Sequence, residues 1–196
     1  MCRCSMPNAC RAALRQERPL KMPPGGRSNS RVELRDIIRS RRSIREYTAQ
    51  IPQEKDIDRI LDAGRWAPSG LNNQPWRFLP VRERSVLSFL AGCTKYRRII
   101  MSAPCAILVF LDNADSYNRD KDLMAIGACI QNMLLEAHAL GLSTCWLGEI
   151  LNQKKRVHEH FALDADLELA AVITLGYADE DITQRPRKPL EKLIVG

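Results

Sequence analysis

Three arginines and a serine occur within five residues, as Arg41, Arg42, Ser43 and Arg45. The guanidinium group offers its donors in a planar fork that matches phosphate oxygens, and a serine hydroxyl adds another donor. The segment can therefore bind a phosphate. Helix C-termini also favour arginine because of the helix dipole, so the segment taken alone has a structural interpretation as well.

A second candidate is the segment from Pro68 to Trp76, which is rich in turn-forming residues and short amides. Small residues such as Ser69 and Gly70 let backbone groups approach a flat ligand, and amides such as Asn72 offer both a donor and an acceptor. An ordinary capping loop that anchors Trp76 in the core explains the same residues.

Two further segments carry weaker signals. In Cys145–Glu149, an expected strand end, Leu147 is followed by Gly148, which permits close approach of a ligand to the backbone. Near the C-terminus, Arg185 and Arg187 stand two residues apart, although charged chain ends are usually just solvated.

The net charge of +7 is unevenly distributed along the 196 residues. Residues 1–31 hold seven of the 30 basic residues and one of the 23 acidic ones, which leaves 23 basic and 22 acidic residues on 32–196. Residues 1–31 are expected to be a basic extension, either disordered or upstream of the native start. A nucleic-acid-binding role would belong to this extension, and for the body we expect no nucleic-acid partner.

The cysteines are typical of a reducing compartment, and we expect a cytoplasmic protein. Cys93, Cys105, Cys129 and Cys145 are scattered singly in apolar surroundings and are expected to be small core residues. The other three cysteines lack a second Cys or His pair at zinc spacing, so no metal site is expected. The longest apolar stretch, Leu123–Leu142, contains polar residues that argue against a membrane span.

The apolar periodicity predicts an α+β protein whose helices flank a sheet, because helices and strands do not alternate strictly. Neither G-x-G-x-x-G nor G-x-x-x-x-G-K-[ST] occurs, which excludes a Rossmann site and a P-loop. Asp112–Asp122 is expected to be a polar connection, and Tyr177–Gly196 an extended basic arm. The expected strands are Arg77–Val81, Ala106–Leu111, Thr144–Leu147 and Leu169–Leu175, and the expected helices run from near residue 30 to Arg41–Arg45, from Pro52 to before Pro68, and over Ser85–Leu90, Tyr96–Met101, Leu123–Gly141 and Lys154–Phe161.

Taken together, these segments resemble the nitroreductase family over nearly everything from residue 32 onward. The motifs that carry the resemblance are R-R-S-x-R at 41–45, A-P-S-G-x-N-x-Q-P-W at 67–76, the helix from Gln131-Asn132 to Leu142, Cys145–Gly148, Gly176-Tyr177 and the R-x-R of the arm. The resemblance implies a three-layer α/β/α sandwich with a mixed, mainly antiparallel central sheet. It also implies a homodimer with FMN at the subunit interface, formed by residues 32–196 with a C-terminal arm at 177–196.

The resemblance further implies a set of cofactor contacts. The residues matching the segment that contacts the phosphate, ribityl chain and pyrimidine edge are Arg41, Arg42, Ser43 and Arg45. Those matching the loop that reaches the flavin of the partner subunit are Pro68, Ser69, Gly70 and Asn72. Leu147 and Gly148 match backbone positions near the reactive N5 atom, and Arg185 and Arg187 match the phosphate-binding end of the arm.

The implied activity is reduction of a small electron-poor oxidant, such as a nitroaromatic or a quinone, with NAD(P)H as a transient electron donor. The flavin would carry the redox chemistry, so no side chain is expected to be catalytic. One of Arg41, Arg42 or Arg45 would place positive charge near the N1–O2 edge of the flavin. Donor and oxidant would share one space in turn, which predicts ping-pong kinetics. Alternatives are a non-catalytic flavin-binding protein or a family variant acting as an ene-reductase, dehalogenase or dehydrogenase.

Overall fold

The computed structural model describes residues 33–181 and 186–195. The chain separates into two units, residues 1–40 and 41–196. In the first unit the structure describes helix α1 (Leu34–Ser40), in which the Ser40 hydroxyl donates to the Asp36 carbonyl. The helix ends one residue before the arginine segment, which was expected to contain its last turn. The segment does not continue the helix because its backbone pairs with a strand instead.

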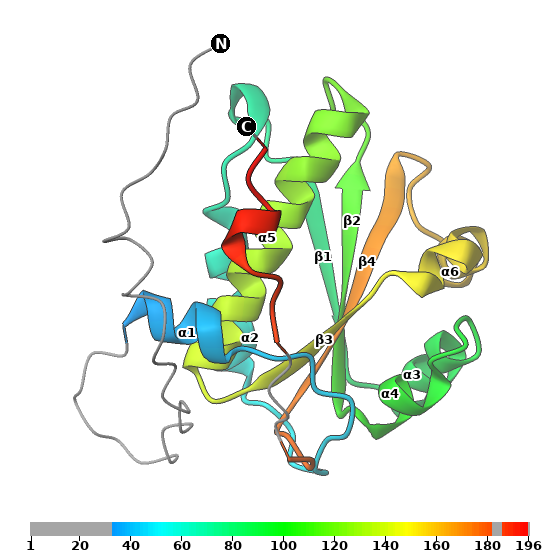
Figure 1. The fold of residues 1–196 in the computed structure, drawn as a ribbon. Coiled ribbons are helices and arrows are strands. Elements are labelled where there is room, and N and C mark those ends of the chain that lie inside the picture. The colour runs from blue at the N-terminus through cyan, green and yellow to red at the C-terminus, as the bar shows by residue number, and fades with distance from the viewer. Residues whose placement is uncertain (1–32, 182–185, 196) are drawn as a thin grey trace, which may run out of the picture. The chain divides into compact units, whose positions relative to one another are not determined.

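The second unit contains a mixed set of helices and strands in the order expected (Figure 1). The described strands form one sheet in the order β1-β2-β4-β3, and each neighbouring pair is antiparallel. The elements are α2 (Glu54–Arg65), β1 (Trp76–Val81), α3 (Arg84–Ala91), α4 (Arg97–Ser102), β2 (Cys105–Asp112), α5 (Arg119–Ala139), β3 (Ser143–Leu147), α6 (Lys154–Phe161) and β4 (Leu167–Gly176), with short 3₁₀ helices at Gly70–Asn72, Glu149–Gln153 and Leu190–Lys192.

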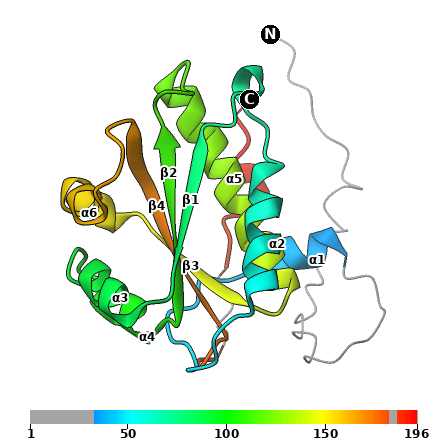
Figure 2. The ribbon, with the colours of Figure 1, turned by 180° about the vertical axis from the view of Figure 1, so that it is seen from behind.

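Helices cover both faces of this sheet. Helices α2 and α5 lie on one face, and α3, α4 and α6 lie on the other (Figures 1 and 2). Strand β2 is buried along its whole length, which explains its continuous apolar sequence. Its alternate residues serve the two layers, because Ile107 and Val109 pack on the α5 side while Leu108 and Phe110 pack on the other. The expected three-layer α+β sandwich is confirmed.

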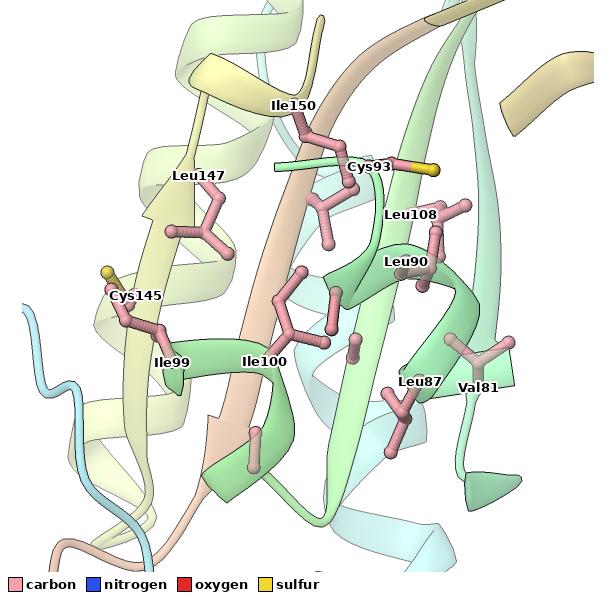
Figure 3. Close-up of a cluster of buried hydrophobic side chains, with 14 of the residues drawn as sticks. Val81, Leu87, Leu90, Cys93, Ile99, Ile100, Leu108, Cys145, Leu147 and Ile150 are labelled. Carbon is pink, nitrogen blue, oxygen red and sulfur yellow. The ribbon is translucent and has the colours of Figure 1, made fainter. Parts of the chain in front are cut away.

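The layer containing α3 and α4 also supports the end of β3. Figure 3 shows Leu147 of β3 and Ile150 of the following turn beside Ile100 and the segment at Cys93. These residues belong to one buried cluster. The four cysteines that the structure describes, Cys93 among them, are buried free thiols, as expected from their apolar surroundings.

Helix α5 begins at Arg119, within the stretch that was expected to be a connection up to Asp122. The Asn118 side chain accepts a hydrogen bond from the Lys121 amide at 3.1 Å and so caps the first turn. This turn carries charged residues rather than an apolar pattern, which is why apolar periodicity placed the start too late. At the other end, Gly141 adopts the left-handed conformation, with φ of 77°.

Within the described part of the chain, no helix is long and apolar enough to cross a membrane. Across the same residues, no three or more His, Cys, Asp or Glu side chains gather as metal ligands would.

Candidate functional site

The segment 41–45 runs alongside the edge strand β3. Ser43 forms a parallel bridge with Thr144, and the Ile44 amide donates to the Thr144 carbonyl at 3.0 Å. This bridge adds a parallel element to a sheet whose other ladders are antiparallel. Pairing with a strand fixes the backbone from which the arginines project.

Two buried side chains anchor the segment to the core. Ile44 and Tyr47 are both buried, and the Tyr47 hydroxyl donates to the Ile44 carbonyl at 2.7 Å. The same hydroxyl lies 2.8 Å from the hydroxyl of Thr174 in β4. Burial raises the pKa of Tyr47 far above its ordinary value, so this residue is a neutral structural donor.

The arginine segment and the C-terminal arm together form a concave site. Four arginines and two carboxylates contribute side chains to it, which gives the lining a formal charge of +2. A phosphate dianion balances that charge, and guanidinium groups match its oxygens. The cavity has a volume of about 190 Å³ and is lined by Arg41, Arg42, Ser43, Ile44, Arg45, Glu180, Asp181 and Arg187.

The guanidinium groups of this cavity repel one another. Burial lowers the pKa of Arg41, and the positive charges of Arg42 and Arg187 lower it further. The pKa of His138, on α5, is also lowered, first by burial and then by Arg41 and Arg42. Positive charge is therefore concentrated beside the C-terminal end of α5. The net positive charge of the cavity favours binding of an anion.

Two acidic residues of the site, Glu180 and Asp181, were not expected from the sequence. Glu180 accepts hydrogen bonds from the backbone amides of Arg45 and Glu46, and so ties the arm to the arginine segment. Asp181 lines the same cavity. The sequence signal for this site was its cluster of arginines, which gives no indication of nearby carboxylates. The proximity of 180–181 to 41–45 depends on the end of β4, which no local pattern reveals.

The end of β3 offers an open stretch of backbone. Leu147 is buried in the core, whereas Gly148 is exposed and has no atom within 4 Å of the position that a Cβ would occupy. Gly148, just after the end of β3, is four positions along the chain from Thr144, which corresponds to about 13 Å at the rise of a strand. The arginine segment and this open backbone thus lie along one edge strand.

The loop of Pro68, Ser69, Gly70 and Asn72 has an unusual backbone. Leu71, Asn72 and Gln74 have φ angles of 54°, 56° and 47°, which lie in the left-handed region that favours glycine. The Leu71 side chain is 86% exposed. The loop therefore presents an apolar residue to its surroundings from a strained backbone.

One chain does not bring this loop to the arginine cavity. The loop is bonded through Asn73 to Asp122, in the first turn of α5, whereas the arginines lie beside His138, near the end of the same helix. Sixteen residues separate these two positions, which corresponds to roughly 24 Å at the rise of an α-helix. The loop and the arginine segment therefore lie at opposite ends of α5.

The structure brings most of the predicted arginine and serine residues together. Arg41, Arg42, Ser43, Arg45 and Arg187 line one cavity. Arg185 lies outside the described residues, as does the whole of the 1–31 extension.

Comparisons with known proteins agree with this architecture. The model of the Nitroreductase family matches residues 38–91 and 81–177. An NADH dehydrogenase/NAD(P)H nitroreductase of Archaeoglobus fulgidus is 32% identical over 148 residues, which are 74% of this chain and 85% of that protein. An iodotyrosine deiodinase of Thermotoga neapolitana is 26% identical, over 83% of this chain and 96% of its own length.

A solved structure matches more closely still. The crystal structure of a nitroreductase in complex with FMN from Desulfovibrio desulfuricans superposes with a TM-score of 0.81. Its sequence is 44% identical, and the match covers 85% of this chain and 98% of that one. The family model spans well over half of the sequence, and both the fold and the identities agree with it. This chain belongs to the nitroreductase family.

Proposed function

We propose that this FMN-dependent oxidoreductase takes electron pairs from NAD(P)H and passes them to a small electron-poor acceptor, such as a nitroaromatic or a quinone. The observation that carries the proposal is the arginine cavity, whose charge and donors suit the phosphate of FMN. No nucleotide-binding glycine motif is present to hold an adenine dinucleotide. When bound, FMN supplies the two-electron chemistry that no side chain of the chain offers.

In this proposal the residues bind and orient FMN. Arg41, Arg42, Ser43 and Arg187 hold the phosphate, and Arg185 assists them. Arg45 adds a further positive charge to the lining of the cavity. Because the backbone of the segment is already fixed by its pairing with Thr144, these groups need little rearrangement when the anion binds. The exposed backbone at Gly148, next to the buried Leu147, would face the ring, where a side chain at position 148 would obstruct nicotinamide and oxidant.

The proposed assembly is a homodimer. The separation of the loop of 68–72 from the arginine cavity leaves each chain with two incomplete half-sites, which two chains can complete for each other. The arm supports the same assembly, because large apolar side chains in it are exposed, with Val195 fully so. We assign residues 32–196 to the FMN-binding domain and 177–196 to an arm that covers the partner. Residues 1–31 are an extension, and the cytoplasm is the proposed location.

The experiment that tests the proposed function combines cofactor analysis with steady-state kinetics. The purified protein is expected to release FMN, and not FAD, at one flavin per subunit, as measured by mass spectrometry and absorbance. With NADH or NADPH and a quinone or nitroarene, double-reciprocal plots are expected to be parallel, because one space serves donor and acceptor in turn.

Several outcomes would count against the proposal. Release of FAD contradicts the cofactor assignment, and intersecting lines contradict the shared space. Bound FMN without turnover with either nicotinamide identifies a non-catalytic flavin-binding protein. Halogenated phenols belong in the acceptor series, because a relative is named as an iodotyrosine deiodinase. A strong preference for these acceptors over quinones and nitroarenes would replace the proposed substrate class by reductive dehalogenation.

A further inference from the structure

The loop that the proposed function assigns to the flavin of the partner subunit is held in a costly conformation. Leu71, Asn72 and Gln74 adopt left-handed backbone angles without being glycines. Such residues persist where surrounding contacts enforce them, and they gather at functional sites. The Oδ1 atom of Asn73 is buried and accepts no hydrogen bond from the described residues. The conformation of the loop is therefore intrinsically unfavourable and must be held by contacts with the rest of the chain.

The fully buried carboxylate of Asp122 is hydrogen-bonded to this loop. Asp122, in the first turn of α5, has no exposed surface. Its Oδ1 atom accepts a hydrogen bond from Nδ2 of Asn73 at 2.9 Å. Burial alone would raise the pKa of Asp122, yet hydrogen bonds from Ser116, Asn73, Asn118 and Tyr117 lower it below its ordinary value. Asp122 is accordingly an ionised acceptor at neutral pH.

The two oxygens of Asp122 have different tasks. Oδ2 accepts from the Ser116 hydroxyl at 2.7 Å and from the amides of Tyr117 and Asn118 at 3.1 Å each. These three bonds are local, because their donors lie within six residues of Asp122 in the segment just before α5. The bond from Asn73 to Oδ1 instead joins residues 49 positions apart and reaches the loop.

A second contact fixes the direction of the Asn73 amide. Nδ2 also donates to the Asp115 carbonyl at 2.9 Å, so both neighbours of this atom are acceptors. A flipped amide would place its oxygen against them. The phenol of Tyr117 lies directly over Gly70, where a Cβ would collide with the phenol oxygen. The loop and the connection before α5 thus lock together at two points.

We propose that Asp122 and Asn73 are positioning residues for the flavin. They hold Leu71, Asn72 and Gln74 in the left-handed conformation in which the loop meets FMN of the partner subunit. This inference rests on the proposed function, which assigns the loop to the flavin. The competing explanation is that Asp122 only stabilises the start of α5. The bond from Asn73 distinguishes the two explanations, because it is the bond to Asp122 that comes from the loop.

The test compares Asn73→Ala with the matched control Ser116→Ala in the full-length protein. Each substitution removes one hydrogen bond to Asp122, and Asn73→Ala also removes the bond to the Asp115 carbonyl. Only Asn73→Ala removes bonds that reach the loop. Fluorescence titration of the cofactor-free protein with FMN is expected to give an affinity about tenfold weaker for Asn73→Ala. The affinity of Ser116→Ala is expected to stay within about twofold of the wild type, although both variants lose thermal stability.

A donor–acceptor exchange provides a rescue that does not depend on one variant folding well. Asp122→Asn alone places an amide against the Asn73 amide, whereas Asp122→Asn with Asn73→Asp restores one hydrogen bond with its direction reversed. The new carboxylate at position 73 then also faces the Asp115 carbonyl, so the recovery is expected to be partial. The double variant is expected to bind FMN more tightly than either Asp122→Asn or Asn73→Asp. Equal losses in Asn73→Ala and Ser116→Ala, or the absence of rescue, would overturn the proposal. A wild-type protein that binds no FMN would overturn the proposed function itself.

Discussion

Deletion of residues 183–196 is expected to abolish dimerisation and FMN binding together. The described part of this segment contributes Arg187 to the cavity and exposes Leu190, Leu193, Ile194 and Val195, which a lone chain leaves uncovered. If the arm covers a partner while its arginine reaches the cofactor, each event stabilises the other. Light scattering should report a monomer, and absorbance of the same sample should show flavin content close to zero.

Two controls separate the possible causes of that result. Removal of residues 1–31 should leave both the dimer and its flavin intact, because no role at the site is assigned to this extension. Arg187→Ala should weaken FMN binding while the dimer persists, because it removes one charge and none of the apolar contacts. A truncated protein that remains dimeric with its full FMN complement would refute the proposed role of the arm.

Substitution of Arg41 by alanine is expected to weaken FMN binding by about one to two powers of ten, since a charge-assisted hydrogen bond contributes about 1.5 to 3 kcal/mol. The stability of the cofactor-free protein should be unchanged or increased. Arg41 is half-buried and is repelled by Arg42 and Arg187, so its removal relieves repulsion in the cofactor-free protein. The melting temperature without FMN should therefore stay level or rise. Ser43→Ala should also weaken binding.

A matched substitution checks whether any loss of positive charge has this effect. Lys155→Ala removes a cation whose side chain is 91% exposed on α6, outside the cavity lining. FMN titration and thermal melts of the three variants should show a loss of affinity for Arg41→Ala and Ser43→Ala but not for Lys155→Ala. Wild-type affinity in both cavity variants would mean that the segment does not contact the cofactor.

Local sequence patterns predicted the layers of the fold and the arginine half of the site. Runs such as β2 are apolar because they are buried on both faces, and the arginines are adjacent in the chain. The patterns did not predict the pairing of Ser43 with Thr144 or the placement of Glu180 beside Arg45, since these contacts join segments about 100 residues or more apart. Such contacts depend on the assembled sheet.

The loop was the least predictable part of the site. Its turn-forming residues indicated a loop, but leucine and glutamine give no signal for the left-handed angles seen at Leu71 and Gln74. Those angles accompany a hydrogen bond from Asn73 to a carboxylate 49 positions away. The sequence placed Asp122 in a polar connection, where it was one charged residue among many. Its complete burial appears only once α5 is packed.

Subunit complementation tests whether each FMN site combines the arginine segment of one chain with the loop of its partner. Arg41→Ala disables the first half-site, and Gly70→Asp places a carboxylate on the loop. Coexpression with two different affinity tags allows the mixed dimer to be isolated by tandem purification. Flavin content per dimer is then measured by absorbance, with the two parent dimers as controls.

The mixed dimer is expected to hold half the FMN of the wild type. One of its sites receives both substitutions, and the other receives neither. Both parent dimers should hold little FMN, because each of their sites carries one substitution. A mixed dimer as poor in FMN as its parents would refute the shared site, since it would place both half-sites within a single chain.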